Sequence, residues 1–364
     1  MRMIPLEKTF SAFAEFETVG TVVGCAPYGN GHINDTFLVD CVDEAGDKRY
    51  ILQAINTHIF KKPNQVMHNI QKVTTFLRND ATDPRRVLSL VFTKDGRSCY
   101  TDADGRVWRV YDFVEDSLCL ESPETREDFY QSAVAFGDFQ KRLGKFPVDE
   151  LFEVIPDFHN TPDRYRKFLQ AVEEDVCGRA ADVQEEIAFV TARAAFYSLL
   201  ADANREGRLP LRVTHNDTKM NNVMLDKSTR TALCVIDLDT IMPGFSVNDF
   251  GDSIRFGAST AAEDETDLSK VTLDVELFET YVKGFLAGCD GMLTPEEVDL
   301  MPEGAKMMTM ECGMRFLTDY LQGDVYFKTK YDTHNLVRCR TQFKLVADME
   351  AKWEQLKAVV QKYR

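Results

Sequence analysis

The periodicity of the sequence changes near residue 122, and this change limits the fold more than any other feature of the chain. Up to about residue 115, short β-rich runs alternate with turn signals such as Asp95-Gly96 and Asp104-Gly105. Such alternation is typical of an antiparallel sheet. Beyond Ser122, apolar residues recur at helical spacing in long amphipathic segments. The pattern predicts an α+β chain, with its β-rich part first and its helical part second.

These two parts suggest two lobes joined by a hinge near residues 112–116. We expect an N-terminal nucleotide-binding lobe over residues 1–115 and a C-terminal catalytic and substrate-binding lobe over residues 116–364, because a cleft between lobes suits a nucleotide. Strands are expected at residues 33–40, 49–55, 87–93, 97–101 and 107–113, and a sheet-and-turn segment at 212–239. Helices are expected at residues 64–79, 123–144 (with an N-cap at Ser122), 161–178, 182–206, 274–287, 295–322 and 333–362.

The overall charge restricts the partners of this 364-residue chain. Its formal net charge of -16 makes the average surface repel phosphate backbones, so neither nucleic acid nor an anionic membrane is an expected partner. No run of about 18 apolar residues could span a bilayer, and a cytoplasmic location is expected. Nine scattered cysteines without a C-x-x-C pair argue against a zinc site and a disulfide framework. The sequence leaves the oligomeric state open.

One short segment carries groups that phosphoryl transfer requires. In His215-Asn216-Asp217, followed five positions later by Asn222, the spacing matches the pattern H-R-D-x-x-x-x-N. In that pattern Asp is the catalytic base and Asn holds a magnesium ion. Lys219 would place an ammonium group on the transferred phosphoryl. The segment is therefore predicted to be the catalytic loop of a kinase.

A second magnesium ligand is predicted at the end of a buried strand. The apolar run 232–236 delivers Asp237 as a hard oxygen ligand, and Asp239 would point to the same side. The triplet Asp249-Phe250-Gly251 spells D-F-G, but it lies 27 residues past Asn222, against 15 for Asp237. We therefore expect its carboxylate to accept hydrogen bonds from the catalytic loop or to cap the next helix. Asp and Asn also gather in loops by chance, so only the complete set of residues favours a catalytic site.

Glycines near the N-terminus predict a loop that covers phosphates. In residues 28–36, Gly29 and Gly31 would let main-chain N–H groups approach phosphate oxygens. Asn34 and Thr36 would add side-chain donors. Gly-Asn-Gly is also an ordinary turn, so this assignment depends on the downstream catalytic segment.

These motifs together resemble the aminoglycoside phosphotransferase and choline kinase-like superfamily, whose members have a bilobal protein-kinase-like fold. The resemblance covers nearly the whole chain. Its motifs look like those of the N-acetylhexosamine 1-kinases, and they are YGNGHINDT (residues 28–36), HNDTKMNNV (215–223), VIDLDTIMPG (235–244) and RFLTDYL (315–321). The resemblance implies phosphorylation of the anomeric (C1) hydroxyl of N-acetylglucosamine or N-acetylgalactosamine by ATP and Mg²⁺. It also implies the same roles for Asp217, Asn222 and Asp237 as their spacing does.

The resemblance further implies that four side chains face the sugar: His32, Phe256, Arg315 and Tyr326. Simpler alternatives stay open for three of them. Phe256 could be an ordinary core phenylalanine, and Tyr326 could pack at a helix end. Arg315 could form a surface ion pair with Glu311, four residues earlier on the same helix.

The nucleotide would be held in part by the N-terminal strands. Kinases carry a lysine on the third strand paired with a helix glutamate, but this chain has Gln53 there and no acidic residue at 65–71. We expect Gln53 and the loop donors to hold the phosphates. The main-chain groups of Phe113, Val114 and Glu115 are expected to bind the edge of the adenine base. The alternating apolar residues of the strand that precedes them would also occur in an ordinary core strand that binds no nucleotide.

Two other functions stay open, and the missing lysine and glutamate motivate the second of them. One is a kinase for another hydroxyl, such as that of choline, homoserine, an aminoglycoside or a different sugar. The other is a non-catalytic protein that binds a nucleotide or a sugar. We favour a working kinase because Asp217, Lys219, Asn222 and Asp237 are all present.

Overall fold

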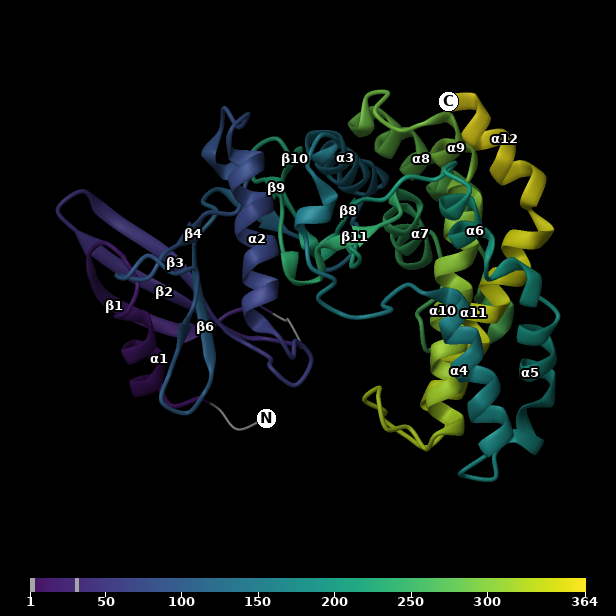
Figure 1. The fold of residues 1–364 in the computed structure, drawn as a ribbon. Coiled ribbons are helices and arrows are strands. Elements are labelled where there is room, and N and C mark those ends of the chain that lie inside the picture. Colours follow the sequence, from purple (N-terminus) through teal and green to yellow (C-terminus); the bar gives the residue numbers. More distant parts are fainter. Residues whose placement is uncertain (1–3, 30–32) are drawn as a thin grey trace.

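The computed structural model describes residues 4–29 and 33–364. The N-terminal part of the structure is an antiparallel sheet. The predicted site residues Gly31 and His32 lie outside the described residues. The strands are β1 (Thr21–Pro27), β2 (Asp35–Asp43), β3 (Gly46–Ile55), β4 (Leu90–Val91), β5 (Tyr100–Thr101) and β6 (Val107–Asp112). Their spatial order is β1-β2-β3-β6-β4, and β5 pairs with β6. Figure 1 shows this sheet in purple and blue, apart from the helices of the C-terminal part.

The strand register places three polar side chains in one row across the sheet. Thr36 on β2 pairs with Gln53 on β3, and Gln53 pairs with Arg109 on β6. Directly paired residues on neighbouring antiparallel strands point to the same face. The alternation of apolar side chains sets this register. It puts a buried arginine beside the strand position where kinases carry their lysine.

Helix α2 (Pro63–Arg78) stands between the sheet and the C-terminal part (Figure 1). It confirms the helix expected at 64–79. Proline lies in its first turn, where a missing N–H costs little. One apolar stripe faces the core, and it contains Val66, Ile70, Val73 and Leu77. A shorter helix, α1 (Leu6–Phe13), precedes the sheet and was not predicted.

The C-terminal part is mostly helical, as expected (Figure 1, teal to yellow). Its helices are α3 (Arg126–Leu143), α4 (Thr161–Glu174), α5 (Gln184–Thr191), α6 (Leu199–Arg205), α7 (Ser246–Gly257), α8 (Val275–Cys289), α9 (Pro295–Asp299), α10 (Met301–Leu321), α11 (His334–Ala351) and α12 (Trp353–Tyr363). Helix α10 packs against α4, α7 and α11, and most of its residues are buried. Within residues 4–29 and 33–364, no helix is long and apolar enough to cross a bilayer.

Helices α7 and α10 cross at two glycines. A Cβ atom on Gly251 would lie 2.3 Å from the carbonyl oxygen of Gly304, and one on Gly304 would lie 2.3 Å from that of Val247. Only residues without a Cβ allow the two backbones to approach so closely. The crossing fixes α7, which carries Asp249, against the buried helix α10.

Some of the predicted boundaries of helices and strands were wrong. The helix expected at 182–206 is interrupted by a 3-10 turn at Ala194–Phe196, which the pattern could not reveal because alanine is a good helix former. Helix α3 begins after Thr125 rather than Ser122, since Thr125 and Asp128 form a reciprocal capping box. The strands expected at 87–93 and 97–101 shorten to two-residue strands because a tight turn joins them: the Thr93 N–H bonds the Arg97 carbonyl at 2.8 Å.

Two small antiparallel sheets confirm the sheet-and-turn segment expected at 212–239. Their strands are β7 (Ser117–Cys119), β8 (Arg212–Thr214), β9 (Val223–Asp226), β10 (Ala232–Val235) and β11 (Met242–Gly244). β9 pairs with β10 and with β7, whereas β8 pairs with β11. The loop between β8 and β9 carries Asp217, and Asp237 follows β10. This arrangement brings the two predicted catalytic segments together.

Candidate active site

The predicted catalytic loop begins at His215, whose side chain is fully buried. Its Nε2 lies 2.8 Å from the carbonyl oxygen of Ile236, and its Nδ1 accepts the main-chain N–H of Asp217 at 3.3 Å. These contacts fit a neutral ring with its proton on Nε2. The histidine therefore ties the catalytic loop to the residue just before Asp237.

Asp217 lies between a cation and an amide. Lys219 Nζ is 2.6 Å from its Oδ1, and Asn222 Nδ2 donates to its Oδ2 at 3.1 Å and to its main-chain oxygen at 2.7 Å. Burial opposes the charge on Lys219, but Asp217 outweighs it and raises the pKa of the lysine. The Asp217 side chain remains 23% exposed, so an acceptor hydroxyl can reach it. Three residues predicted from spacing thus meet around one carboxylate.

Asp249 anchors the same loop from α7. Its buried carboxylate accepts the main-chain N–H groups of His215 and Asn216, both at 2.8 Å, and the Gln140 amide at 2.9 Å. Asn216 has a φ of +64°, a left-handed conformation that asparagine adopts more readily than most residues. The expectation that the Asp249 carboxylate accepts hydrogen bonds from the loop is confirmed. It is not a helix cap, because α7 begins at Ser246.

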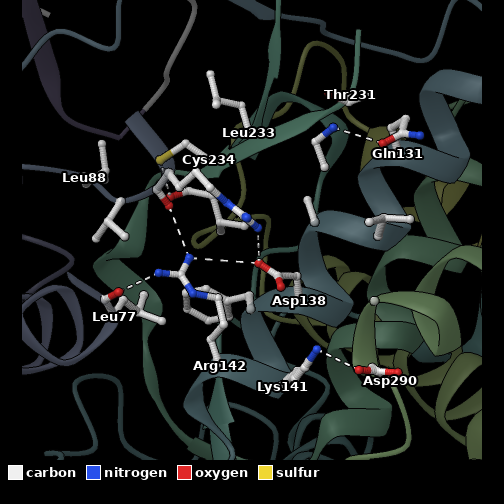
Figure 2. Close-up of a pocket in the computed structure, with 18 of the residues that line it drawn as sticks. Leu77, Leu88, Gln131, Asp138, Lys141, Arg142, Thr231, Leu233, Cys234 and Asp290 are labelled. Atoms are coloured by element: carbon white, nitrogen blue, oxygen red, sulfur yellow. Dashed lines mark hydrogen bonds and ion pairs between the residues drawn. The ribbon is translucent and has the colours of Figure 1, made fainter. Parts of the chain in front are cut away.

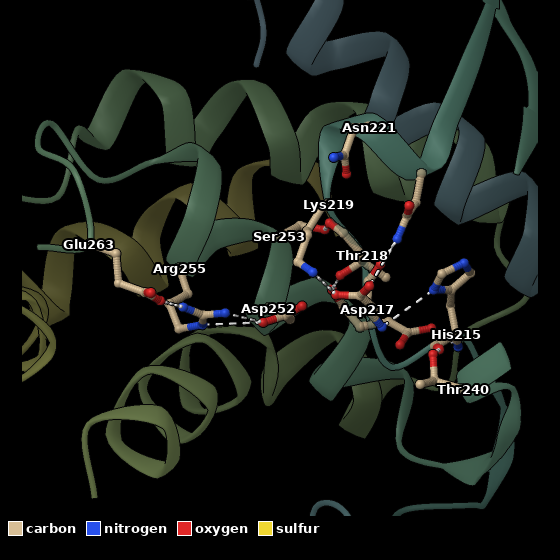
Figure 3. A network of polar contacts seen from close by, with 12 residues as sticks. His215, Asp217, Thr218, Lys219, Asn221, Thr240, Asp252, Ser253, Arg255 and Glu263 are labelled. Atoms are coloured by element: carbon tan, nitrogen blue, oxygen red, sulfur yellow. Dashed lines mark hydrogen bonds and ion pairs between the residues drawn. The ribbon is translucent and has the colours of Figure 1, made fainter. Parts of the chain in front are cut away.

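Charged groups extend from Lys219 along α7 (Figure 3). Arg255 is buried and donates to Asp252 and Glu263, both at 2.9 Å. Asp252 favours the charged form of Lys219, and Arg255 opposes it. Helix α7 therefore influences both the position of the catalytic loop and the electrostatic potential at its lysine.

Asp237 has the properties expected of a metal ligand. Its backbone is left-handed, with a φ of +57°, and the residue is exposed to solvent. Its carboxylate makes no hydrogen bond or ion pair within residues 4–29 and 33–364. The protein around the carboxylate partly removes its hydration, and the nearby carboxylates of Asp239 and Asp217 repel its charge. Both effects raise the pKa of Asp237 to about 6. An unpaired carboxylate in a negative environment favours a divalent cation.

The residues fit Mg²⁺ bound together with phosphates rather than in a protein cage. Within the described part of the chain, no group of three or more His, Cys, Asp or Glu could hold a metal. Mg²⁺ commonly takes one or two protein ligands and fills its other positions with water and substrate phosphates. Asn222 and Asp237 would be those ligands, and the ion would neutralise phosphate charge.

The described part of the phosphate loop is engaged with protein groups. Gly29 has a φ of +76°, which glycine adopts at no steric cost. Asn34 Nδ2 donates to Asp239 Oδ2 at 2.7 Å, and Gln53 Nε2 donates to Thr36 Oγ1 at 3.0 Å. The donors expected for phosphates are therefore held in place by neighbouring side chains.

Arg109 lies among these groups, and sequence reasoning missed it. Its Nε donates to Gln53 Oε1 at 2.9 Å, and its guanidinium forms a buried ion pair with Asp239. The available signal was a charged residue in the middle of the strand Val107–Asp112, with apolar residues on both sides of it. The sequence does not show that Arg109 pairs with Gln53 across β3 and β6, and this pairing is what places Arg109 near the predicted nucleotide site.

The predicted hinge follows β6. The N–H of Phe113 donates to the carbonyl of Arg49 at 3.0 Å and is unavailable to a base. The N–H groups of Val114 and Glu115 make no hydrogen bond in the described chain, so both would be available to the predicted adenine. The Arg49 guanidinium lies 4.0 Å from the centre of the Phe113 ring and pairs with Glu115. Tyr28 contacts the same ring edge-on, with 5.9 Å between centroids.

Three residues assigned to the sugar lie along α7 and α10 or just beyond. Phe256 is 41% exposed, and its ring centre is 5.6 Å from Lys219 Nζ. The Arg315 guanidinium lies 5.8 Å from the ring centre of Tyr326, which is 70% exposed. The alternative ion pair of Arg315 with Glu311 does not form, because Glu311 is buried and bonded to side chains at the start of α4.

A cavity of about 200 Å³ adjoins Arg315, and more cationic than anionic side chains line it. Its cationic lining residues are Arg164, Lys167 and Arg315. Lys167 is paired with Asp163, whereas burial and the neighbouring Arg315 lower the pKa of Arg164. The acid in its wall, Asp319, is buried and already accepts the main-chain N–H groups of Tyr326 and Phe327 and the amide of Asn335.

A larger cavity, of about 320 Å³, lies between α2, α3 and β10 (Figure 2). At its wall, Arg142 donates to the carbonyl of Leu77 at 2.6 Å and lies 4.0 Å from Asp138. Burial raises the pKa of the Cys234 thiol to about 12, so the thiol is unreactive. The lining contains none of the predicted site residues, and we assign this cavity no part in catalysis.

Residues 24–275 match the model of the phosphotransferase enzyme family APH. The match covers more than half of the chain and includes the described phosphate loop, the hinge, the catalytic loop and Asp237. The chain belongs to this family. The prediction of a small-molecule phosphotransferase is thereby confirmed, while nothing in the match is specific to N-acetylhexosamines.

Several solved structures have the same fold as this phosphotransferase over nearly its whole length. A microcompartment-associated aminopropanol kinase shares 17% identity, with 97% of this chain and 99% of that chain covered and a TM-score of 0.62. An aminoglycoside phosphotransferase from Alicyclobacillus acidocaldarius shares 13% identity, with 100% and 98% covered and a TM-score of 0.63. A spectinomycin phosphotransferase in complex with ADP and spectinomycin shares 11% identity, with 98% and 100% covered and a TM-score of 0.61. The protein-kinase-like bilobal fold is therefore confirmed.

Proposed function

We propose that this phosphotransferase transfers the γ-phosphoryl group of ATP, with Mg²⁺, to the anomeric hydroxyl of an N-acetylhexosamine. Residues 1–115 would bind the nucleotide, and residues 116–364 would supply the catalytic groups and the acceptor pocket. The choice of this acceptor rests on the resemblance of the sequence motifs to those of the N-acetylhexosamine 1-kinases. Structural neighbours that hold ADP or GDP support a nucleotide donor.

The catalytic part of the proposal depends on the surroundings of Asp217. An acceptor hydroxyl beside its partly exposed carboxylate would be oriented and would give up its proton to Oδ1 or Oδ2. Lys219 Nζ lies 2.6 Å from Oδ1. Once a hydroxyl is bound at that carboxylate, the ammonium group of Lys219 would stabilise the negative charge on the phosphoryl oxygens. The protein would contribute mainly positioning and charge stabilisation, as is usual in phosphoryl transfer.

The charge of the acceptor pocket supports a sugar over an amino alcohol. Arg164 and Arg315 carry positive charge there, and Asp319 is already saturated by three donors. A cationic acceptor such as ethanolamine, aminopropanol or an aminoglycoside would be repelled. Hydroxyl and acetamido oxygens can instead accept hydrogen bonds from the guanidinium of Arg315. A non-catalytic role is disfavoured, because such a protein would not need Asp217, Lys219 and Asn222 in contact.

A panel of acceptors tests the proposal directly. The protein, Mg²⁺ and ATP are incubated with N-acetylglucosamine, N-acetylgalactosamine, glucose, choline, ethanolamine, homoserine and kanamycin, and ADP release is measured. We expect turnover with the two N-acetylhexosamines, and phosphorus NMR should place the new phosphate on C1. Phosphate on another carbon, or turnover only with amines, would overturn the assignment.

A further inference from the structure

A closed ring of polar side chains joins the phosphate loop to the metal-binding segment. Arg109 pairs with Asp239, and its Nε donates to Gln53 Oε1 at 2.9 Å. Gln53 Nε2 donates to Thr36 Oγ1 at 3.0 Å. Asn34, two residues before Thr36, closes the ring by donating to Asp239 Oδ2 at 2.7 Å.

The ion pair at the centre of this ring is buried. The Arg109 side chain is 1% exposed and that of Asp239 is 3% exposed. Both carboxylate oxygens of Asp239 are used, one by Arg109 and the other by Asn34. Separating the pair would leave an uncompensated charge in a low-dielectric interior, which is strongly unfavourable. The ring is therefore a fixed arrangement, unlike a surface ion pair.

The members of the ring come from both parts of the nucleotide site. Asp239 lies in a 3-10 turn, Leu238–Thr240, two residues after the candidate metal ligand Asp237. Asn34 belongs to the predicted phosphate loop, and Gln53 occupies the strand position where kinases carry a lysine. The ring therefore sets where Asn34 and Thr36 lie relative to the candidate metal ligand Asp237.

We propose that this ring performs the task of the missing lysine–glutamate pair, with Arg109 as a positioning residue for nucleotide and metal. The guanidinium does not itself hold phosphate, because it is buried and bonded to Gln53 and Asp239. It acts through Asp239 on the turn that carries Asp237, and through Gln53 on the loop donor Thr36. The inference rests on the proposed function in that the ligand is a magnesium nucleotide.

Binding of Mg·ADP, measured by calorimetry without any acceptor, tests the ring separately from the choice of sugar. We expect Arg109→Met and Asp239→Asn each to weaken Mg·ADP binding by roughly 10–100-fold, the usual effect of losing a residue that orients a ligand-binding group. The KM for Mg·ATP should rise with the dissociation constant, while the KM for the sugar stays within about two-fold because the ring does not touch the acceptor pocket.

A double variant separates positioning from direct phosphate contact. If Arg109 acts through Asp239, the Arg109→Met/Asp239→Asn protein should bind Mg·ADP about as well as either single variant. Losses that multiply in the double variant would overturn the proposal. So would Asp239→Asn with wild-type affinity, because an arginine that held phosphate directly would not need Asp239.

Arg193→Met is the matched control. Arg193 follows α5 and pairs at 2.6 Å with Glu350 on α11, and Figure 1 shows both helices far from the sheet. This variant should lose stability but keep the wild-type Mg·ADP affinity, and an equal loss of affinity would show that any broken ion pair has the same effect. If Arg109→Met does not fold, Gln53→Leu cuts the ring and leaves the ion pair, and wild-type affinity in that variant contradicts the proposal.

The two proposals can fail independently. A wild type that binds Mg·ADP but phosphorylates no acceptor would contradict the proposed function and leave the calorimetric comparison intact. A wild type that phosphorylates an N-acetylhexosamine, with Arg109→Met unchanged in nucleotide affinity and KM for Mg·ATP, would overturn the ring alone.

Discussion

The carboxylate of Asp249 accepts the main-chain N–H of His215 at 2.8 Å, although 34 residues separate the two in the chain. This bond links α7 to the first residue of the catalytic loop. The helix is in turn held by its glycine crossing with α10. The D-F-G letters around Asp249 therefore serve the shape of the loop, whereas the Asp237 carboxylate makes no hydrogen bond or ion pair with the described residues.

Asp249→Asn should weaken both the fold and the catalytic loop. The amide keeps one acceptor oxygen and turns an NH₂ group toward main-chain donors, and each lost hydrogen bond to a charged group costs about 1.5–3 kcal/mol. We expect a lower free energy of unfolding in urea and a lower kcat. Asp267→Asn, at the N-cap of an exposed 3-10 turn, is the control and should change neither by much. Wild-type stability and kcat in Asp249→Asn would contradict the anchoring role.

Asp217→Asn should remove the proton acceptor and leave the nucleotide site. General base catalysis contributes typically 10²–10⁴-fold, so kcat should fall by about that factor. Calorimetric affinity for Mg·ADP should stay within a few fold, since the shape of the side chain is kept. Residual turnover within tenfold of the wild type would argue against Asp217 as the base.

Arg315→Met should act on the acceptor and not on the donor. The guanidinium lies at the cavity of about 200 Å³ and has no carboxylate partner among the described residues. We expect the KM for the sugar to rise by roughly tenfold or more, as for the loss of one polar contact to a ligand, with an unchanged KM for ATP. Arg205→Met, at a side chain that is 76% exposed, is the control and should leave both constants unchanged. A rise in the KM for ATP alone would place Arg315 elsewhere in the reaction.

The buried ion pair of Glu297 with Arg212 should make stability depend on pH. Burial raises the pKa of Glu297, but Arg212 and other donors lower it further, so the pKa lies below its ordinary value of 4.5. The unfolded chain therefore binds the proton first as pH falls. The stabilisation is fully present above about pH 4.5 and is lost as pH falls through the folded pKa. The stability difference between wild type and Glu297→Gln, measured by urea unfolding, should shrink from about pH 6 to about pH 4. A difference independent of pH would contradict this.

Much of the organisation followed from local sequence. The apolar period of two or of about 3.6 residues determined which segments are strands and which are helices, because each period places one face against a core. The spacing from Asp217 to Asn222 and Asp237 determined the candidate catalytic groups, since these residues lie on short segments next to paired strands. The break between α5 and α6 escaped prediction because Ala194 and Ala195 suit a helix as well as a turn.

Other features were decided only by tertiary structure. Arg109 and Asp239 are 130 residues apart, and their pairing depends on the register of β3 with β6 and on the turn after β10. The sequence could show that an arginine lies in an apolar strand, but not which carboxylate would meet it. By itself the sequence indicated the candidate catalytic residues, because their chemistry is carried in short motifs. Only packing between distant segments decided how the phosphate loop is fixed, because buried polar groups must find partners wherever the fold brings them.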